Sequence, residues 1–189
     1  MDTLSLEGRT AVVTGAGQNI GKAIALKLAA HGANVTVCGH TNRANAEAVA
    51  AEARDFGVGA VAILLDIGKP DEVAAMVDET ANAFGSVDII VANAAIRPHQ
   101  PFFEISIEDW QRVINTNLSS AFYLSRAALP HMCRRGWGRV IHISGRDGTM
   151  ADPDRAHNVT CKAGLHGLTK ALAVEFGKVN ELSLIASSL

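Results

Sequence analysis

Residues 10–22 read Thr-Ala-Val-Val-Thr-Gly-Ala-Gly-Gln-Asn-Ile-Gly-Lys, and this stretch decides the fold. The small and β-branched residues 10–13 predict a buried strand. Three glycines follow, Gly15, Gly17 and Gly21, and then an apolar pattern typical of a helix. At such a turn the first backbone N–H groups of the helix have no intrahelical partner, and glycines let an anion approach them closely. The stretch therefore predicts a phosphate-binding loop, and the alternative is a tight turn without a ligand.

The pattern of a strand followed by a helix recurs along the chain. Continuous apolar runs predict further strands, and periodic apolar positions between caps and glycines predict helices. The expected strands are 34–38, 60–65, 87–92 and 139–143, and the later helices begin near residues 41, 70, 106 and 156. Strands whose residues do not alternate between apolar and polar are covered on both faces of the sheet. Short connections that contain a helix require the strands they join to be parallel. The expected fold class is α/β, a doubly wound parallel sheet in a single domain over residues 1–189.

Composition excludes several functions. The net charge of −2 gives no basic field for nucleic acid, and no apolar run is long enough to span a membrane. Cys38, Cys133 and Cys161 are too widely spaced to suggest a metal site or a disulfide framework. Residues 1–8 lack the regions of a signal peptide. We expect a cytoplasmic protein without a metal.

Polar residues cluster where the ligand crevice of such a sheet lies, beyond the carboxyl ends of the strands. They comprise the glycine loop, Gly39-His40, Asp66, Asn93 and Ser144. A nucleoside triphosphatase loop is rejected, because five residues separate Gly15 from Gly21 and Ala23 follows Lys22 where a hydroxyl is needed.

The elements Thr14-Gly15-x-x-x-Asn19-x-Gly21, Asp66, Asn93-Ala94-Ala95, Asn117 and Lys162 resemble the compact type of the short-chain dehydrogenase/reductase family, over residues 6 to about 180. The resemblance implies a Rossmann-type domain that binds NAD or NADP. The loop would hold the pyrophosphate through Gly15, Gly17, Asn19, Ile20 and Gly21. Asp66 and Ile67 would contact the adenine, and Asn93, Ala94 and Ala95 would line the nicotinamide side, together with Lys162 at the ribose. Alternatives stay open: Asp66 as a helix cap, and Asn93 as a structural bridge between strands.

Two positions of the cofactor half depart from the family. Asn19 replaces a glycine, and asparagine is the other residue best suited to positive φ. Gly39 stands where an acidic residue would bind the ribose 2′-hydroxyl, and His40 and Arg43 follow. His40 and Arg43 are hydrogen-bond donors and no carboxylate lies beside them, which favours binding of NADP, through its 2′-phosphate, over NAD. Arg43 as a solvated helix residue is the alternative.

The catalytic half departs further. The family uses a Tyr as general acid/base with a Lys four residues on, a Ser upstream and an Asn in the long helix. Lys162 and Asn117 match, whereas Asn158 stands at the Tyr position and Gly145 at the Ser position. An amide does not ionise at neutral pH. Ser144 beside Gly145 and His157 beside Asn158 are the candidate substitutes, and the alternative for His157 is an ordinary, partly exposed histidine.

Residues 181–189 do not follow the family pattern and form an atypical tail with room for one short strand. We expect the fold to be truncated after the helix that follows the fifth strand. The resemblance implies an NAD(P)-dependent oxidoreductase that transfers a hydride between nicotinamide and a small carbonyl or secondary alcohol substrate, as a homodimer or homotetramer. The alternative is a cofactor-binding but catalytically impaired or silent member, acting as a binding subunit or existing as a truncated fragment.

Overall fold

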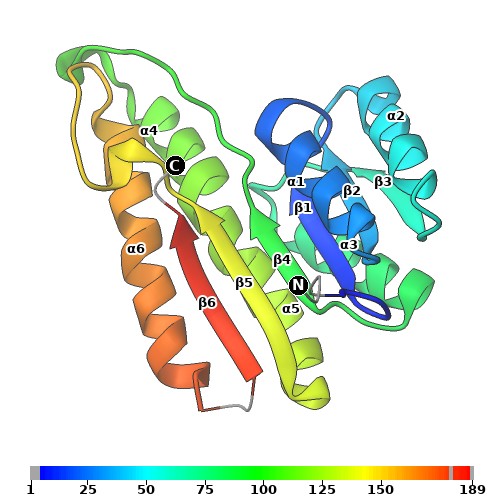
Figure 1. Cartoon of the computed structure of the whole chain (residues 1–189). Coiled ribbons are helices and arrows are strands. Elements are labelled where there is room, and N and C mark those ends of the chain that lie inside the picture. The colour runs from blue at the N-terminus through cyan, green and yellow to red at the C-terminus, as the bar shows by residue number, and fades with distance from the viewer. Residues whose placement is uncertain (1–4, 179–180, 188–189) are drawn as a thin grey trace.

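The computed structural model describes residues 5–178 and 181–187, in which six parallel strands form one sheet in the order β3-β2-β1-β4-β5-β6 (Figure 1). The strands are β1 Thr10–Thr14, β2 Asn34–Gly39, β3 Ala60–Leu64, β4 Ile89–Ala92, β5 Trp137–Ile143 and β6 Glu181–Ser187. The α-helices are α1 Asn19–Ala30, α2 Arg43–Arg54, α3 Pro70–Phe84, α4 Ile107–Ile114, α5 Ser120–Arg135 and α6 Ala156–Phe176. The doubly wound α/β sheet expected from the sequence is confirmed.

The strand order reverses at β1, which pairs with β2 on one side and with β4 on the other. The chain runs outward from β1 to β3 and then returns to the centre of the sheet as β4. In doubly wound sheets, such a switch point leaves a crevice at the carboxyl ends of the two strands. The polar residues that the sequence singles out follow these strand ends.

Two apolar layers cover the sheet. One cluster joins β1 and β2 to α1 and α2 through residues that include Val13, Ala25 and Val49. The other joins the opposite side of the strands to α3 and α5 through residues that include Met76 and Leu124. The central strands β1, β2 and β4 are therefore buried on both sides, which explains why their sequences are apolar without alternation.

The helix boundaries follow the local signals. Asn42 accepts a hydrogen bond from the Asn45 N–H at the start of α2, over 3.0 Å. Ser106 caps α4 in the same way, accepting from the Asp109 N–H over 3.0 Å. Gly85 ends α3 at φ 83°, a conformation open to glycine.

The long helix expected from residue 106 to about 134 is interrupted. A π-helical turn, η2 (Asn115–Ser119), separates α4 from α5. Such turns insert a residue into the helix and re-aim its side chains, often at functional sites. This turn contains Asn117.

The end of the sheet corrects one expectation. The sheet does not stop at its fifth strand, because β6 pairs in parallel along the whole of β5, from Trp137–Glu181 to Ile143–Ser187. The atypical tail thus forms the one strand expected of it, β6. Its backbone pairs with the N–H and C=O groups along the edge of β5, which would otherwise be unpaired. Residues 188 and 189 of the expected tail lie outside the described residues.

Candidate cofactor and active site

The glycine-rich turn between β1 and α1 leaves the start of α1 open. Gly15 has φ 64° and Asn19 has φ 50°, so Asn19 adopts the positive φ expected of it. A Cβ at Gly21 would lie 2.2 Å from the carbonyl oxygen of Gly15, which requires glycine there. The Gln18 side chain makes no capping bond, and the first turn of α1 has no acidic residue. The N–H groups and the positive end of the helix dipole therefore face the crevice, as a phosphate site requires.

Thr14 and Asn93 lock this turn to the end of β4. The Thr14 hydroxyl donates to the Val91 carbonyl oxygen over 3.2 Å and accepts from the Asn93 and Ala94 N–H groups over 3.0 and 3.1 Å. The Asn93 amide donates to the carbonyl oxygens of Thr14 and Gly15 over 3.0 and 3.3 Å. Asn93 thus bridges the two strands. The organising role of Thr14 escaped the sequence analysis, which placed it in the motif only.

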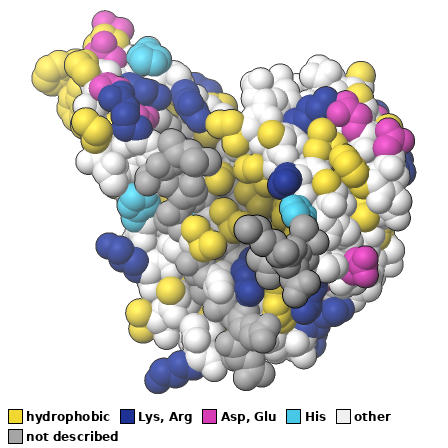
Figure 2. Space-filling model, in the orientation of Figure 1, with side chains coloured by type: hydrophobic (Ala, Val, Ile, Leu, Met, Phe, Trp, Pro, Cys, Tyr) yellow, Lys and Arg dark blue, Asp and Glu magenta, His cyan; other side chains and the backbone are white. Residues whose placement is uncertain are grey.

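An open cleft of ≈ 910 Å³ lies over this turn, and Figure 2 shows the hollow at the upper edge of the molecule. Most residues predicted to bind the cofactor line it: Gly15, Gly17, Asn19, Ile20, Gly21, His40, Asp66, Ile67, Asn93, Ala94 and Ala95. The sequence analysis missed further polar lining residues, which are Gln18, Thr41, Asn42, Asn45, Arg97, Arg112 and Thr116. These lie on helix termini and loops, where no strand-end rule identifies them.

Asp66 lines the cleft and also holds a turn. One carboxylate oxygen accepts from the Gly68 N–H over 2.9 Å, two residues before α3 begins. Asp66 is therefore not the cap of α3, since the N-cap position belongs to Lys69, whose side chain makes no capping bond.

Arg43 does not line the cleft. Its side chain is 64% exposed and lies 3.6 Å from the Glu47 carboxylate, one turn further along α2. The structure thus places Arg43 as a solvated helix residue, whereas His40 faces the cleft.

A second, smaller cavity of ≈ 230 Å³ lies beside the cleft and shares Ile20 and Arg97 with it. Its other lining residues are Ile143, Ser144, Gly145, Arg146, Asp147, Arg155, Asn158 and Lys162. Lys162 is buried and its ammonium group donates to the Ile143 carbonyl oxygen over 2.6 Å. Burial, assisted by the charge of Arg97, lowers the pKa of Lys162 to about 8.

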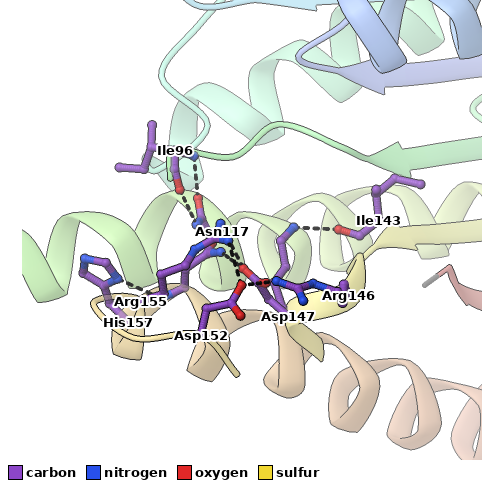
Figure 3. A network of polar contacts seen from close by, with 10 residues as sticks. Ile96, Asn117, Ile143, Arg146, Asp147, Asp152, Arg155 and His157 are labelled. Carbon is purple, nitrogen blue, oxygen red and sulfur yellow. Dashed lines mark hydrogen bonds and ion pairs between the residues drawn. The ribbon is translucent and has the colours of Figure 1, made fainter. Parts of the chain in front are cut away.

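Asn158 is fixed by hydrogen bonds at both ends of its amide, and its two partners, Asn117 and Asp147, are labelled in Figure 3. Its oxygen accepts from the Asn117 amide over 3.0 Å, and its nitrogen donates to Asp147. Asp147 is also paired with Arg155, at 3.0 Å. Asn117 in turn exchanges two 2.8 Å hydrogen bonds with the backbone of Ile96. The structure therefore brings Asn117, Asn158 and Lys162 together, and adds Asp147 and Arg155, which no sequence motif indicated.

Of the two residues proposed to substitute for the serine and tyrosine of the family, Ser144 lies at a cavity and His157 does not. Ser144 lines the second cavity, with its hydroxyl 2.8 Å from Nε2 of His166. His157 lines neither cavity, and its ring lies at the edge of the network in Figure 3, on the side away from Ile143. It is fully buried rather than partly exposed, and burial lowers its pKa. The ring accepts from the Asn158 N–H over 2.8 Å.

Gly145 cannot simply be exchanged for the family serine. Its backbone has φ 72° and ψ −174°. This region is essentially restricted to glycine, because a Cβ would collide with the adjacent peptide. The backbone that places Ser144 in the cavity wall thus excludes a side chain at the next position.

A glycine-rich turn with an uncapped helix start, at the switch point of a doubly wound sheet, is typical of dinucleotide-binding α/β proteins. The family model for the short chain dehydrogenase matches residues 9–185, and the chain belongs to the short-chain dehydrogenase/reductase family. This is a family of NAD(P)-dependent oxidoreductases. The uncapped start of α1, which lies at the cleft, fits the pyrophosphate of such a dinucleotide.

Individual relatives agree with this placement. The 3-oxoacyl-[acyl-carrier-protein] reductase FabG of Staphylococcus aureus is 40% identical over 167 residues, which cover 88% of this chain and 68% of that protein. The D-beta-hydroxybutyrate dehydrogenase of Rhizobium meliloti is 39% identical over 168 residues, covering 88% of this chain and 65% of that protein. A crystal structure described as a short-chain alcohol dehydrogenase of Sinorhizobium meliloti superimposes with a TM-score of 0.93 at 30% identity, covering 97% of this chain and 72% of that one.

Two further properties concern the described residues. None of their helices is both long and apolar enough to cross a membrane. Within the same residues, no cluster of three or more His, Cys, Asp or Glu side chains is arranged to hold a metal ion.

Proposed function

We propose that this chain binds NADP(H) in the cleft and transfers a hydride slowly between its nicotinamide and a small carbonyl or secondary alcohol. The observation that carries the proposal is the uncapped start of α1 at the cleft, which offers backbone N–H groups to a pyrophosphate. The names of two relatives describe a reductase of a 3-oxoacyl group and a dehydrogenase of a β-hydroxy acid, which supports a carbonyl–alcohol pair.

The bound cofactor would supply the hydride, and the protein would supply orientation and charge. Gly15, Gly17, Asn19, Ile20 and Gly21 would surround the pyrophosphate, with Asp66 and Ile67 at the adenine end. Ala94 and Ala95 would line the nicotinamide end, and Lys162 would hold the adjacent ribose beside Asn117. The buried ammonium group of Lys162 and the hydroxyl of Ser144 would face the substrate oxygen from the second cavity.

We expect hydride transfer to be slow because Asn158 stands where the family has its general acid/base. General acid/base assistance contributes about 10²–10⁴-fold to a rate. Asn158 has no ionisable proton, and both ends of its amide are already bonded. A matched pair of variants tests this point: Asn158→Tyr should raise the turnover of NADPH with small ketones by at least about tenfold, and Asn158→Phe should not.

The preference for NADP rests on the end of β2. Gly39 brings no carboxylate to this point, so no charge of its own opposes a 2′-phosphate there. His40, Thr41, Asn42 and Asn45 offer donors to a 2′-phosphate. His40→Ala should weaken NADPH binding more than NADH binding, measured by fluorescence titration, and Arg43→Ala should affect the two alike. Equal losses in His40→Ala would remove the preference.

A silent cofactor-binding subunit is the second candidate, favoured by the fixed Asn158–Asp147 contact. Tight NADPH binding without turnover in the wild type, in Asn158→Tyr and in Lys162→Ala would establish it. Failure of NADPH and NADH to bind at all would contradict both candidates.

We further propose that residues 1–189 act as one domain, in the cytoplasm, within a homodimer or homotetramer. The three cysteines are free, as is typical of a reducing compartment. Phe122 on α5 and Val174 on α6 are 48% and 81% exposed, and supply apolar surface for self-association. Sedimentation velocity tests this, and a concentration-independent monomer would contradict it.

A further inference from the structure

Behind Ser144 lies a titratable side chain that the proposed function does not use, that of His166. Its Nε2 atom is 2.8 Å from the Ser144 hydroxyl oxygen. Ser144 is buried and lines the second cavity, whereas His166 is half-buried and lines neither cavity. The imidazole ring therefore meets the wall of the cavity through the serine hydroxyl group.

His166 continues a row of side chains on α6. Asn158, Lys162 and His166 follow one another at intervals of four residues, so they lie on the same face of the helix. The first two line the second cavity, and the third meets the end of β5. The row thus brings a titratable ring to Ser144, one turn beyond Lys162.

Gly148 makes room for this ring. It ends η3 (Arg146–Gly148), the short helical turn that follows β5 and packs against α6. A Cβ at Gly148 would lie 2.8 Å from Nε2 of His166 and 3.1 Å from its Cε1. The Nε2 edge of the ring is therefore packed between Gly148 and Ser144. The residue as a whole stays partly exposed, which lets the ring exchange protons with water.

Such a contact can carry a proton in both directions. Histidine changes its charge between pH 5 and 8, and a hydroxyl group has one donor and two acceptor positions. A charged His166 ring donates from Nε2 to the Ser144 oxygen, which can then give its own proton to an acceptor in the cavity. An unprotonated Nε2 can instead take the serine proton. A hydroxyl group alone is a weak acid, and an adjacent titratable group makes it reactive.

We propose that His166 supplies and removes the proton of the reaction through the Ser144 hydroxyl group, in place of the family tyrosine, where this chain has Asn158. That a carbonyl group reacts rests on the proposed function, whereas the exchange of a proton between the two side chains does not. His166 touches no reacting atom and acts only through Ser144.

The transfers balance in both directions. During reduction a hydride adds to the carbonyl carbon, and the π electron pair of the C=O bond moves to the oxygen. That oxygen takes the Ser144 hydroxyl proton, the Ser144 oxygen takes the Nε2 proton of charged His166, and the ring is left neutral. Oxidation of an alcohol runs the same transfers in reverse and requires the neutral ring.

Other charged groups near this part of α6 define how a pH profile is interpreted. The charged or titratable side chains within one turn of His166 on α6, or near it on η3 and β5, are Lys162, Lys170, Arg146, Asp147 and His142. On the other elements that pack against α6, Asp109 and Arg112 of α4 act on His157 at the start of α6, and Glu181 of β6 pairs with Trp137 at the far end of β5. Burial lowers the pKa of Lys162 to about 8 and that of His142 to about 4, on either side of the range in which histidine ionises.

His166→Gln tests the transfer while keeping a hydrogen-bond donor beside Ser144. Glutamine has an amide N–H but does not ionise at neutral pH. Turnover of NADPH with small ketones should fall at least about tenfold, a modest share of what general acid/base assistance contributes, with the KM for the ketone and the affinity for NADPH unchanged. His131→Gln is the control and should change nothing, since His131 is equally half-buried, lies on α5 and lines neither cavity.

The pH profile separates proton transfer from a purely structural role. In the wild type, reduction should accelerate as the pH falls from 8 to 5, and oxidation should slow down. Both dependences should be absent in His166→Gln. A wild-type profile that persists in His166→Gln would assign the proton to another group, such as Lys162, and overturn the inference.

A double-mutant cycle with position 158 adds a second criterion. With Asn158→Tyr in place, a tyrosine supplies the proton, so adding His166→Gln should change the rate by no more than about twofold. Equal losses with and without Asn158→Tyr would show that His166 only supports the fold, and would overturn the inference.

NMR tests the contact without coenzyme, in protein whose histidine ring nitrogens are labelled. The signals of the His166 ring are identified by their loss in His166→Gln. They should change between pH 5 and 8, and the Nε2 signal should move in Ser144→Ala and return toward the wild-type position in Ser144→Thr, which keeps the hydroxyl group. A ring that does not titrate, or an Nε2 signal that is the same in Ser144→Ala, would overturn the inference.

The outcomes distinguish this inference from the proposed function. If NADPH is oxidised by ketones equally fast in the wild type and in His166→Gln, the inference is overturned and the proposed function stands. If NADPH binds but the wild type shows no turnover, the inference is overturned and cofactor binding stands. If NADPH does not bind, the proposed function falls and the inferred role of His166 falls with it.

Discussion

At three positions of this site, the backbone conformation or the burial of a residue determines which side chain fits and what proton chemistry it offers. At position 145 the backbone excludes a side chain next to Ser144. At position 158 an amide joins Asn117 to Asp147 and offers no ionisable proton. At position 162 a buried ammonium group remains beside Arg97.

The serine of the family should not be tolerated at position 145. Because φ 72° with ψ −174° is a glycine conformation, Gly145→Ser should lower the free energy of unfolding by about 1–3 kcal/mol. Gly167→Ser is the control, since Gly167 lies in α6 and an added Cβ meets nothing within 4 Å. Urea unfolding measures both, and equal midpoints for the two variants would show that residue 145 is not strained.

Lys162 should make stability depend on alkaline pH. Burial lowers its pKa in the folded protein from 10.5 to about 8, so between these values the unfolded chain binds more protons. The free energy of unfolding should therefore rise with pH across this window, by up to about 3 kcal/mol, and be constant below it. The measurement is the difference between wild type and Lys162→Met at each pH. A difference that does not change from pH 8 to 10.5 would refute the shift.

Two parts of the helices position the residues of the site: the start of α1 and the π turn η2 between α4 and α5. The start of α1 faces the cleft without a cap, because Gly15 and Asn19 turn the chain sharply after β1. The π turn η2 between α4 and α5 holds Asn117 against Ile96 and Asn158. The start of α1 lines the cleft proposed for the coenzyme, and η2 holds Asn117 against Asn158, which lines the second cavity.

Two glycines of the turn should respond differently to alanine. Gly21→Ala places a Cβ 2.2 Å from a backbone oxygen and should destabilise the fold by about 1–3 kcal/mol. At Gly17 the nearest atom is 3.6 Å away, so Gly17→Ala should fold normally and lose about tenfold in NADPH affinity by obstructing the pyrophosphate. Thermal unfolding and fluorescence titration separate the two effects. Unchanged NADPH affinity in Gly17→Ala would mean that no phosphate approaches this backbone.

A buried histidine, His142, connects the sheet to two of the helices that pack against it. His142 in β5 lies 2.8 Å from the Thr169 hydroxyl in α6 and 3.4 Å from the Ser125 hydroxyl in α5. Burial, with the charge of Lys162, lowers its pKa to about 4. The neutral ring thus joins the sheet to two helices.

Acid should weaken this connection. Between pH 6.5 and about 4 the unfolded chain takes up a proton that the folded chain does not, so stability should fall as pH falls through this range, by up to about 3 kcal/mol. His142→Gln should show a smaller slope of unfolding free energy against pH, whatever its absolute stability. Identical slopes for wild type and His142→Gln, measured by urea unfolding, would contradict a neutral buried ring.

Much of the architecture, and many of the residues that line the large cleft, can be predicted from the sequence. Apolar runs and capping residues depend on neighbours in sequence, so the strands, helices and the glycine turn follow from local patterns. The positive φ of Asn19 is of this kind. The parallel order of the strands follows from the short helical connections. The sequence predicted room for one short strand in residues 181–189, and the structure extends the sheet there by β6, because pairing with the edge of β5 needs only backbone groups.

The sequence by itself thus determined the α/β fold and the glycine-rich turn after β1, since these are properties of residue type and spacing, and the same local reading predicts that Asn158 and Gly145 stand at the tyrosine and serine positions of the family. Only the tertiary structure decided that Arg43 faces solvent, that His157 is buried away from the cavity, and that Asp147, Arg155 and Arg97 join the site. The reason is that loops after β4 and β5 bring together residues some 50 positions apart, and no local pattern encodes which way those side chains turn.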